Sequence, residues 1–92
     1  MAPYVFFGKY SQEAIKSISA ERTKKATALI EKNGGKVITG YALMGKYDLL
    51  LIADFKDTQQ AMKTSVGLAK LLGIGFTTAP AVTVEEFDKL IS

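Results

Sequence analysis

Two short runs, residues 4–10 and 47–55, are apolar on both of their alternating faces, and this feature constrains the fold most strongly. In YVFFGKY, Phe6 and Phe7 point to opposite sides of a strand, and neighbouring leucines do the same in YDLLLIADF. An antiparallel sheet with one face in water carries apolar residues mainly on its other face. We therefore expect a sheet whose two faces are both covered, only one of them by helices.

Four segments have the residue pattern of strands: residues 4–10, 36–43, 47–55 and 74–84. One helical pattern lies between the first two strands, a second lies between the last two, and a short helix is expected at residues 85–91. The resulting order is βαββαβ, which predicts an α+β, ferredoxin-like fold with an antiparallel four-stranded sheet. Right-handed crossovers place the first and third strands in the middle and both helices on one face.

Local signals predict where these elements begin and end. Ser19 can act as a second N-cap, so the first helix is expected in two pieces. Asp57 is expected to cap the next long helix, and Gly73 is expected to end it. Gly45 favours a tight reversal between the second and third strands, and Pro80 marks the last strand as an edge strand or a bulged strand.

The sheet face without helices would expose Phe, Leu and Ile side chains in one patch. Burying about six such side chains in a partner contributes on the order of 10 kcal/mol before association costs. We therefore expect a homo-oligomer, a dimer or larger, with two sheets face to face and Phe6, Phe7, Leu49 and Leu51 at the interface. In the alternative arrangement the terminal helix folds under the sheet and covers part of this face, but it is too short to cover all of it.

The composition excludes several kinds of chemistry. The 92 residues form a single domain, 1–92, and contain no Cys and no His. Thiolate catalysis, a Ser-His dyad, histidine-ligated haem and an ordinary zinc site are therefore excluded, and we expect no metal and no cofactor. The sequence contains no apolar run of about 20 residues and no signal-peptide pattern. We expect a cytoplasmic protein without membrane association.

The net charge of +3 raises the question of a nucleic-acid partner. The basic excess lies in the first half, and such a run is usually a solvated face. The segment VFFGKY resembles the first aromatic motif of RNA-recognition domains, which share this fold. That function also needs stacking aromatics on the third strand, where YDLLLIADF is aliphatic. We therefore expect no nucleic-acid partner.

Asp48 stands at the start of the most apolar run of the chain. A buried carboxylate without a partner costs several kcal/mol, roughly, so Asp48 needs a partner or a function. In one interpretation it binds a ligand together with Gly45, Tyr47 and Tyr41, or serves with a Tyr as acid and base. In the other it accepts hydrogen bonds at the hairpin, or pairs with Lys46 or with a lysine of a partner chain.

The segment Gly45-Lys46-Tyr47-Asp48 resembles the Gly-x-Tyr-Asp motif of the GYD-domain family, small bacterial and archaeal proteins of unassigned function. Further matching segments occur in the family's order: Tyr10–Glu13, Ser19–Arg22, Gly34–Lys36, Thr77-Thr78 and Glu85-Glu86. One departure is Ala20, which stands where the family often has Pro. The ordered set of segments is more specific than the short motif alone.

The resemblance implies a dimeric α+β barrel. A similar strand start occurs in the effector-binding domains of leucine-responsive-type regulators, which are dimeric and bind amino acids. Cofactor-independent monooxygenases share the barrel, but their usual site His has no counterpart here. The expected function is a non-enzymatic dimeric barrel that binds a small molecule or a protein partner. The alternative is a small cofactor-independent enzyme that acts on a hydrophobic substrate inside the barrel.

Overall fold

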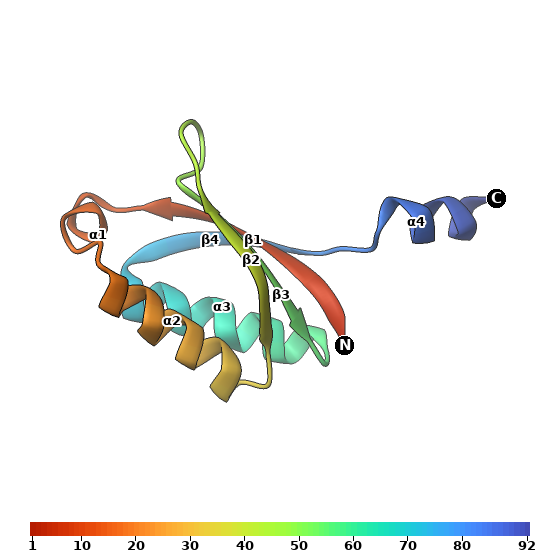
Figure 1. The fold of residues 1–92 in the computed structure, drawn as a ribbon, viewed down its shortest axis with the longest axis horizontal. Helices are drawn as coiled ribbons and strands as arrows, with labels where there is room; N and C mark the ends of the chain where they lie inside the picture. The colour runs from red at the N-terminus through yellow and green to blue at the C-terminus, as the bar shows by residue number, and fades with distance from the viewer.

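A computed structural model describes residues 1–92 as an antiparallel four-stranded sheet with two long helices on one face (Figure 1). In chain order the elements are β1 (Ala2–Tyr10), α1 (Gln12–Lys16), α2 (Ala20–Lys32), β2 (Lys36–Ala42), β3 (Leu49–Phe55), α3 (Thr58–Leu72), β4 (Ile74–Pro80) and α4 (Val84–Ile91). The predicted βαββαβ order and α+β class are confirmed, and the first helix is broken as expected. No helix combines the length and the apolar character needed to cross a membrane.

The strands are arranged in the order β2-β3-β1-β4, so the first and third strands are central as predicted. The helix-covered side of the sheet carries the core. Phe6 and Phe55 are fully buried there, with their ring centroids 5.9 Å apart, and Tyr4 packs edge-on against Phe55. Ile30 of α2 and Leu68 of α3 complete this core from the helices. Both helices are thereby fixed to the same side of the sheet.

Side-chain caps explain where the helices begin. The hydroxyl oxygens of Ser11, Ser19 and Thr83 each accept a hydrogen bond from a backbone N–H in the first turn that follows, and the Asp57 carboxylate does the same for α3. Gly73 ends α3 with a φ of 68°, a left-handed conformation that costs glycine little. These local signals are the part of the fold that the sequence specifies most directly.

Each strand differs from its predicted bounds at one end. β1 begins at Ala2 instead of residue 4, and β2 ends at Ala42 instead of residue 43. β3 begins at Leu49 instead of residue 47, because Tyr47 and Asp48 belong to the connection after β2. β4 ends at Pro80 instead of residue 84; the N–H of Ala81 still donates to the carbonyl oxygen of Pro3, but Pro3 has no N–H with which to return a bond and continue the ladder. The connection that contains Gly45 extends beyond the sheet (Figure 1), and Gly45 has a φ of 146°.

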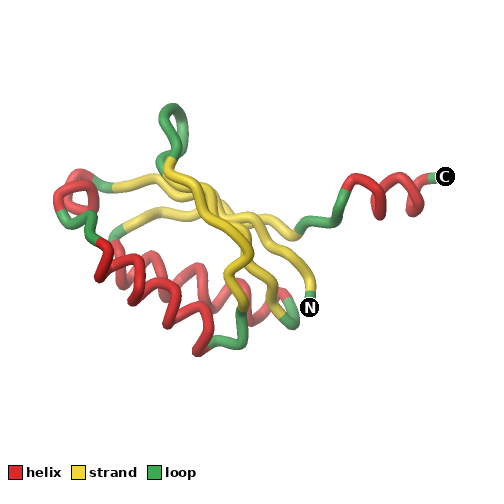
Figure 2. Tube along the Cα trace, in the orientation of Figure 1, coloured by secondary structure: helices red, strands yellow, loops and turns green.

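The terminal helix does not fold under the sheet. Figure 2 shows α4 extending away from the rest of the molecule after a short connection. All of its residues are exposed, including Val84, Phe87, Leu90 and Ile91. The sheet face opposite α2 and α3 is therefore uncovered in the single chain.

Candidate functional site

Asp48 joins the connection after β2 to the end of β1. Its carboxylate Oδ2 accepts a hydrogen bond of 2.8 Å from the backbone N–H of Tyr10. Its own backbone N–H donates to the carbonyl oxygen of Gly8 at 2.8 Å, and its carbonyl oxygen accepts from the N–H of Leu43 at 2.9 Å. The ammonium of Lys9 lies 3.8 Å from Oδ2. The carboxylate is thus occupied by backbone and by a neighbouring charge.

The same end of the sheet holds Arg22, which the sequence did not single out as a site residue. Its guanidinium lies 5.6 Å from the ring centroid of Tyr10, and Nη1 donates a hydrogen bond of 2.6 Å to the carbonyl oxygen of Ala14. Arg22 therefore links α2 to the last turn of α1 and to β1. The sequence signal for Arg22 is the segment Ser19–Arg22, in which Ser19 is the predicted N-cap and Arg22 matches the family pattern.

Tyr47 lies against Phe7, with ring centroids 5.1 Å apart, and the ammonium of Lys46 lies 5.7 Å from the Tyr47 ring. Strand alternation predicted Tyr47 on the same side as Leu49. The structure differs because Tyr47 precedes β3, so strand alternation does not set its direction. Tyr47 instead packs beside an uncovered strand residue.

We call the uncovered sheet face the open face and define its centre by Val5, Phe7, Leu50 and Ile52. Val5 pairs with Ile52 and Phe7 pairs with Leu50 across β1 and β3, so the four side chains lie in two adjacent rows. Tyr41 pairs with Leu50 from β2 and extends one row to the sheet edge. The open face is apolar at its centre and carries aromatic rings at one end.

Only Phe7, among the four residues expected at a subunit interface, lies on the open face. Phe6 is fully buried under the helices, and Leu51 pairs with Phe6 on that side. Leu49 pairs with Gly8 and also lies on the helix-covered side. The alternation of side chains was predicted correctly, but the wrong set of β3 leucines was assigned to the uncovered side.

A bulge in β2 shapes the edge beside the open face. The pairing with β3 shifts between Val37 and Thr39, so Ile38 has no partner and is half exposed. The shift places Val37 opposite Ala53 on the core side and Thr39 opposite Ile52 on the open face. The second strand therefore contributes Thr39 and Tyr41, both with hydroxyl groups, to the open face.

The expected ligand-binding residues are only partly brought together. Tyr47 and Asp48 are adjacent in the chain, but the Asp48 carboxylate turns to β1 while the Tyr47 ring packs on Phe7. Gly45 lies at the exposed tip of the connection, and Tyr41 lies on β2 with 58% of its surface exposed. No group of three or more acidic side chains is placed to hold a metal ion. Phe7 and Tyr47 pack together at one end of the open face, and Tyr41 lies on the neighbouring strand β2.

Comparisons with known proteins support the fold. The family model of the GYD domain matches residues 4–91. Among solved structures, the leucine response regulatory protein LrpA of Mycobacterium tuberculosis is similar in fold, with a TM-score of 0.59 and 7% sequence identity. The match covers 90% of this chain and 51% of LrpA, so the chain spans about half the length of that protein. The comparison with curated proteins finds no match.

Proposed function

The chain belongs to the GYD domain family, and we propose that it works as a homodimeric barrel that binds a small molecule between two sheets without catalysing a reaction. The observation that carries this proposal is the open face. Val5, Phe7, Leu50 and Ile52 form a continuous apolar surface, while all helices that pack on the sheet lie on its other side. A second open face is the surface most complementary to it in shape and chemistry.

The proposed interface differs in its residues from the first expectation. Phe6, Leu49 and Leu51 support the core of each subunit, and Val5, Leu50 and Ile52 join Phe7 at the interface. Burying these four side chains from each subunit contributes on the order of 10 kcal/mol before association costs. A micromolar dissociation constant corresponds to about 8 kcal/mol net, and association itself costs several kcal/mol, so a stable dimer must also bury the flanking rings of Tyr41 and Tyr47.

The ligand would lie at the end of the barrel that carries the aromatic rings. Phe7 and Tyr47 form a packed pair there, and Tyr41 extends from the neighbouring edge strand. Aromatic walls with a few hydroxyl groups are typical of sites for small organic molecules. The likeness to LrpA, a regulator named for its response to leucine, supports a small effector of amino-acid size.

The alternative of a small enzyme has weaker support. Its acid or base would be Asp48, but Oδ2 already accepts a hydrogen bond from Tyr10 and has Lys9 beside it. A general base must instead reach a proton of the substrate. The nearest tyrosine in sequence, Tyr47, packs its ring on Phe7. These contacts favour a structural role for Asp48 and a binding role for the rings.

Sedimentation equilibrium of the purified protein and of Phe7→Asp tests the subunit contact. We expect an assembly for the natural sequence and a folded chain without the sheet contact for Phe7→Asp, because a carboxylate in the centre of an apolar interface is not compensated. The matched control is Ala28→Asp, which adds the same charge on the exposed surface of α2. A monomeric natural protein at micromolar concentration would overturn the proposal.

Native mass spectrometry tests the ligand. The mass of the assembly is compared with the mass of the same chain after denaturation, and the difference gives any bound molecule. We expect a small organic molecule in the assembly of the natural sequence and its loss in Tyr47→Ala, which removes one wall of the site. Retention of the molecule in Tyr47→Ala would contradict the proposed site. Chemical conversion of the molecule during incubation with the protein would contradict the non-enzymatic function.

A further inference from the structure

α4 is an amphipathic helix that has no packing partner in its own chain. At the helical period, Phe87, Leu90 and Ile91 share one side, and Leu90 exposes 72% of its surface. An isolated helix of this length is marginal in water, because its stability comes mainly from packing of an apolar face. Helix α4 therefore needs a surface, and the charge beside its apolar side indicates which one.

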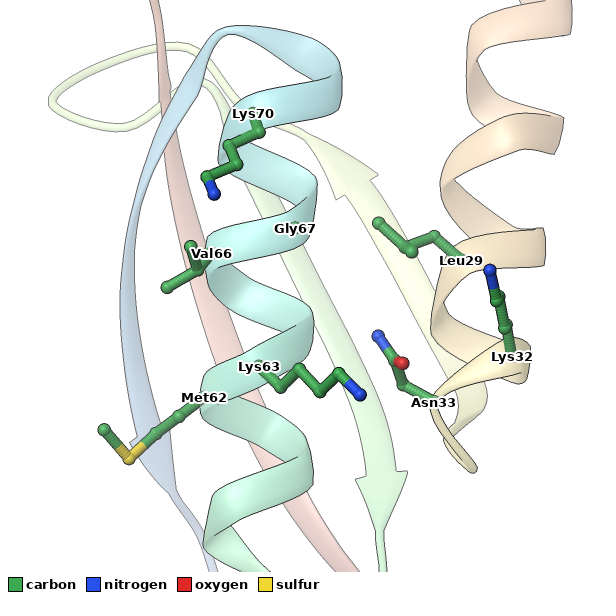
Figure 3. A pocket seen from close by; sticks show the side chains of 8 residues that line it. All are labelled: Leu29, Lys32, Asn33, Met62, Lys63, Val66, Gly67 and Lys70. Carbon is green, nitrogen blue, oxygen red and sulfur yellow. The ribbon is translucent and has the colours of Figure 1, made fainter.

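A shallow groove over the outer side of α3, reaching across to α2 and called here the α2–α3 groove, offers a surface of the opposite charge; Figure 3 shows Met62 and Val66 on the side of α3 turned away from α2, and Lys63 pointing toward α2. It is lined by three apolar and three basic side chains: Leu29, Met62, Val66, Lys32, Lys63 and Lys70. Met62 and Val66 expose 62% and 55% of their surfaces. The three ion pairs of the chain involve Lys9, Lys25 and Lys89, so none of the groove lysines has a carboxylate partner.

The pattern of α4 matches this groove. Glu86 and Asp88 lie on the two sides of the apolar stripe, whereas Glu85 lies on the opposite side of the helix and pairs with Lys89 at 3.6 Å. The eight residues of α4 are about 12 Å long, as is the stretch of α3 from Met62 to Lys70. We propose that α4 of one copy of the chain docks in the α2–α3 groove of a second copy, with its apolar stripe on Met62 and Val66 and its two flanking carboxylates beside the groove lysines.

The helix cannot reach the groove of its own chain without moving the end of β4. The backbone N–H of Ala81 donates to the carbonyl oxygen of Pro3 at 3.0 Å, which leaves Val82 and Thr83 between this anchor and α4. The three Cα–Cα steps from Ala81 to Val84 span at most about 11 Å. A helix packed outside α3 has its axis about 8–10 Å beyond the axis of α3, which itself lies below the sheet. A second copy is therefore the occupant that the geometry favours.

This contact is separate from the sheet contact. The groove lies on the helix side, and the open face lies on the other side of the sheet. A dimer formed through open faces would keep its grooves and its α4 helices free. Docking of α4 then joins such dimers into a larger assembly, so the inference goes beyond the proposed function and does not depend on it.

Disulfide trapping tests the occupant directly, because the chain has no Cys of its own. Val66→Cys and Leu90→Cys are placed in separate, differently tagged chains, mixed and oxidised mildly. We expect a disulfide between the two chains. The comparison pair is Leu90→Cys with Ile52→Cys on the open face. A disulfide formed mainly in the comparison pair, or only within a single chain that carries both Val66→Cys and Leu90→Cys, would overturn the proposal.

The mass of the assembly separates this inference from the proposed function. Leu90→Asp should remove the α4 contact and lower the mass of the assembly, to two chains where the sheet dimer forms and to one chain where it does not, whereas Ser92→Asp, which adds the same charge beyond the stripe, should leave the mass unchanged. Phe7→Asp should instead remove the contact between the open faces of two subunits. A Leu90→Asp variant with the mass of the natural assembly contradicts the docking of α4, and an unchanged Phe7→Asp variant contradicts the sheet dimer alone.

Charge reversal tests the pairing of the flanking carboxylates. Lys63→Glu should weaken the α4 contact about two- to fivefold, because exposed ion pairs contribute less than about 1 kcal/mol. Asp88→Lys should do the same, and the combination of both variants should restore the affinity and its sensitivity to salt. Additive losses in the combined variant would show that Asp88 does not lie beside Lys63 and would overturn this arrangement.

Discussion

The carboxylate of Asp48 accepts a hydrogen bond of 2.8 Å from the backbone N–H of Tyr10, at the point where β1 ends. Together with the backbone bonds of Asp48 to Gly8 and Leu43, this contact fastens the connection after β2 to the central strand β1. The Gly-x-Tyr-Asp segment therefore contributes to the fold through its Asp and presents its Tyr ring to Phe7. The motif thus contributes one residue, Asp48, to the stability of the fold and another, Tyr47, to the open face.

Replacement of Asp48 should lower the stability of the monomeric unit. Asp48→Ala leaves the Tyr10 N–H without its acceptor, and we expect the free energy of unfolding to fall by about 1–3 kcal/mol. Asp48→Asn keeps a side-chain oxygen that can accept the bond, so its loss should be smaller. Urea unfolding followed by far-ultraviolet circular dichroism measures both differences.

The matched control for this series is Glu31→Gln, which changes an exposed carboxylate of α2 to its amide. This variant should unfold at the same urea concentration as the natural protein. Equal unfolding midpoints for Asp48→Ala and Glu31→Gln would contradict the structural role of Asp48. The enzymatic interpretation of Asp48 would then regain support.

Arg22 should stabilise the two-part helix locally. Arg22→Ala removes the hydrogen bond to the Ala14 carbonyl and the cation–π contact with Tyr10, a loss of about 1–2 kcal/mol. Amide hydrogen exchange in α1 should accelerate more than exchange in α3, because Arg22 holds the end of α1. Lys24→Ala, at an exposed position two residues further along α2, should leave the exchange rates of α1 unchanged.

The sequence predicted features that depend on near neighbours in the chain. Caps such as Ser19 and Asp57 and the stop at Gly73 were identified because their hydrogen bonds or φ angles are set within one turn. The two-residue alternation also separated Leu50 and Ile52 from Leu49 and Leu51 correctly, but it does not say which set faces the helices.

Features that depend on contacts between residues far apart in the chain could not be predicted from the sequence. The direction of Tyr47 follows from Phe7, forty residues earlier, and the bulge at Ile38 follows from pairing with β3. The role of Arg22 required knowing that α1 and the end of β1 lie beside it. The position of α4 likewise could not be predicted, because nothing within a helical turn of Val84 determines where the helix packs.

A side chain at Gly35 should lower the stability of the protein. A Cβ built there would overlap the ring of Phe55 and lie 2.9 Å from a methyl carbon of Ile30, both of which are fully buried and have little room to move. Gly35→Ala should therefore lower the free energy of unfolding by about 1–3 kcal/mol. The control is Gly75→Ala, where the added carbon meets no atom within 4 Å. Similar thermal unfolding of the two variants would show that the core beneath Gly35 adapts more readily than its packing indicates.

A tryptophan at Phe7 should report contact between open faces, because the natural sequence contains no Trp. In Phe7→Trp the indole is expected to emit at shorter wavelength at high protein concentration, where the partner sheet excludes water from the ring. Dilution below the dissociation constant should shift the emission to longer wavelength and restore accessibility to a soluble quencher. Ala28→Trp, on the exposed surface of α2, should show the same emission at every concentration. Concentration-independent emission from Phe7→Trp, at a wavelength typical of water-exposed indole, would contradict the sheet-to-sheet contact.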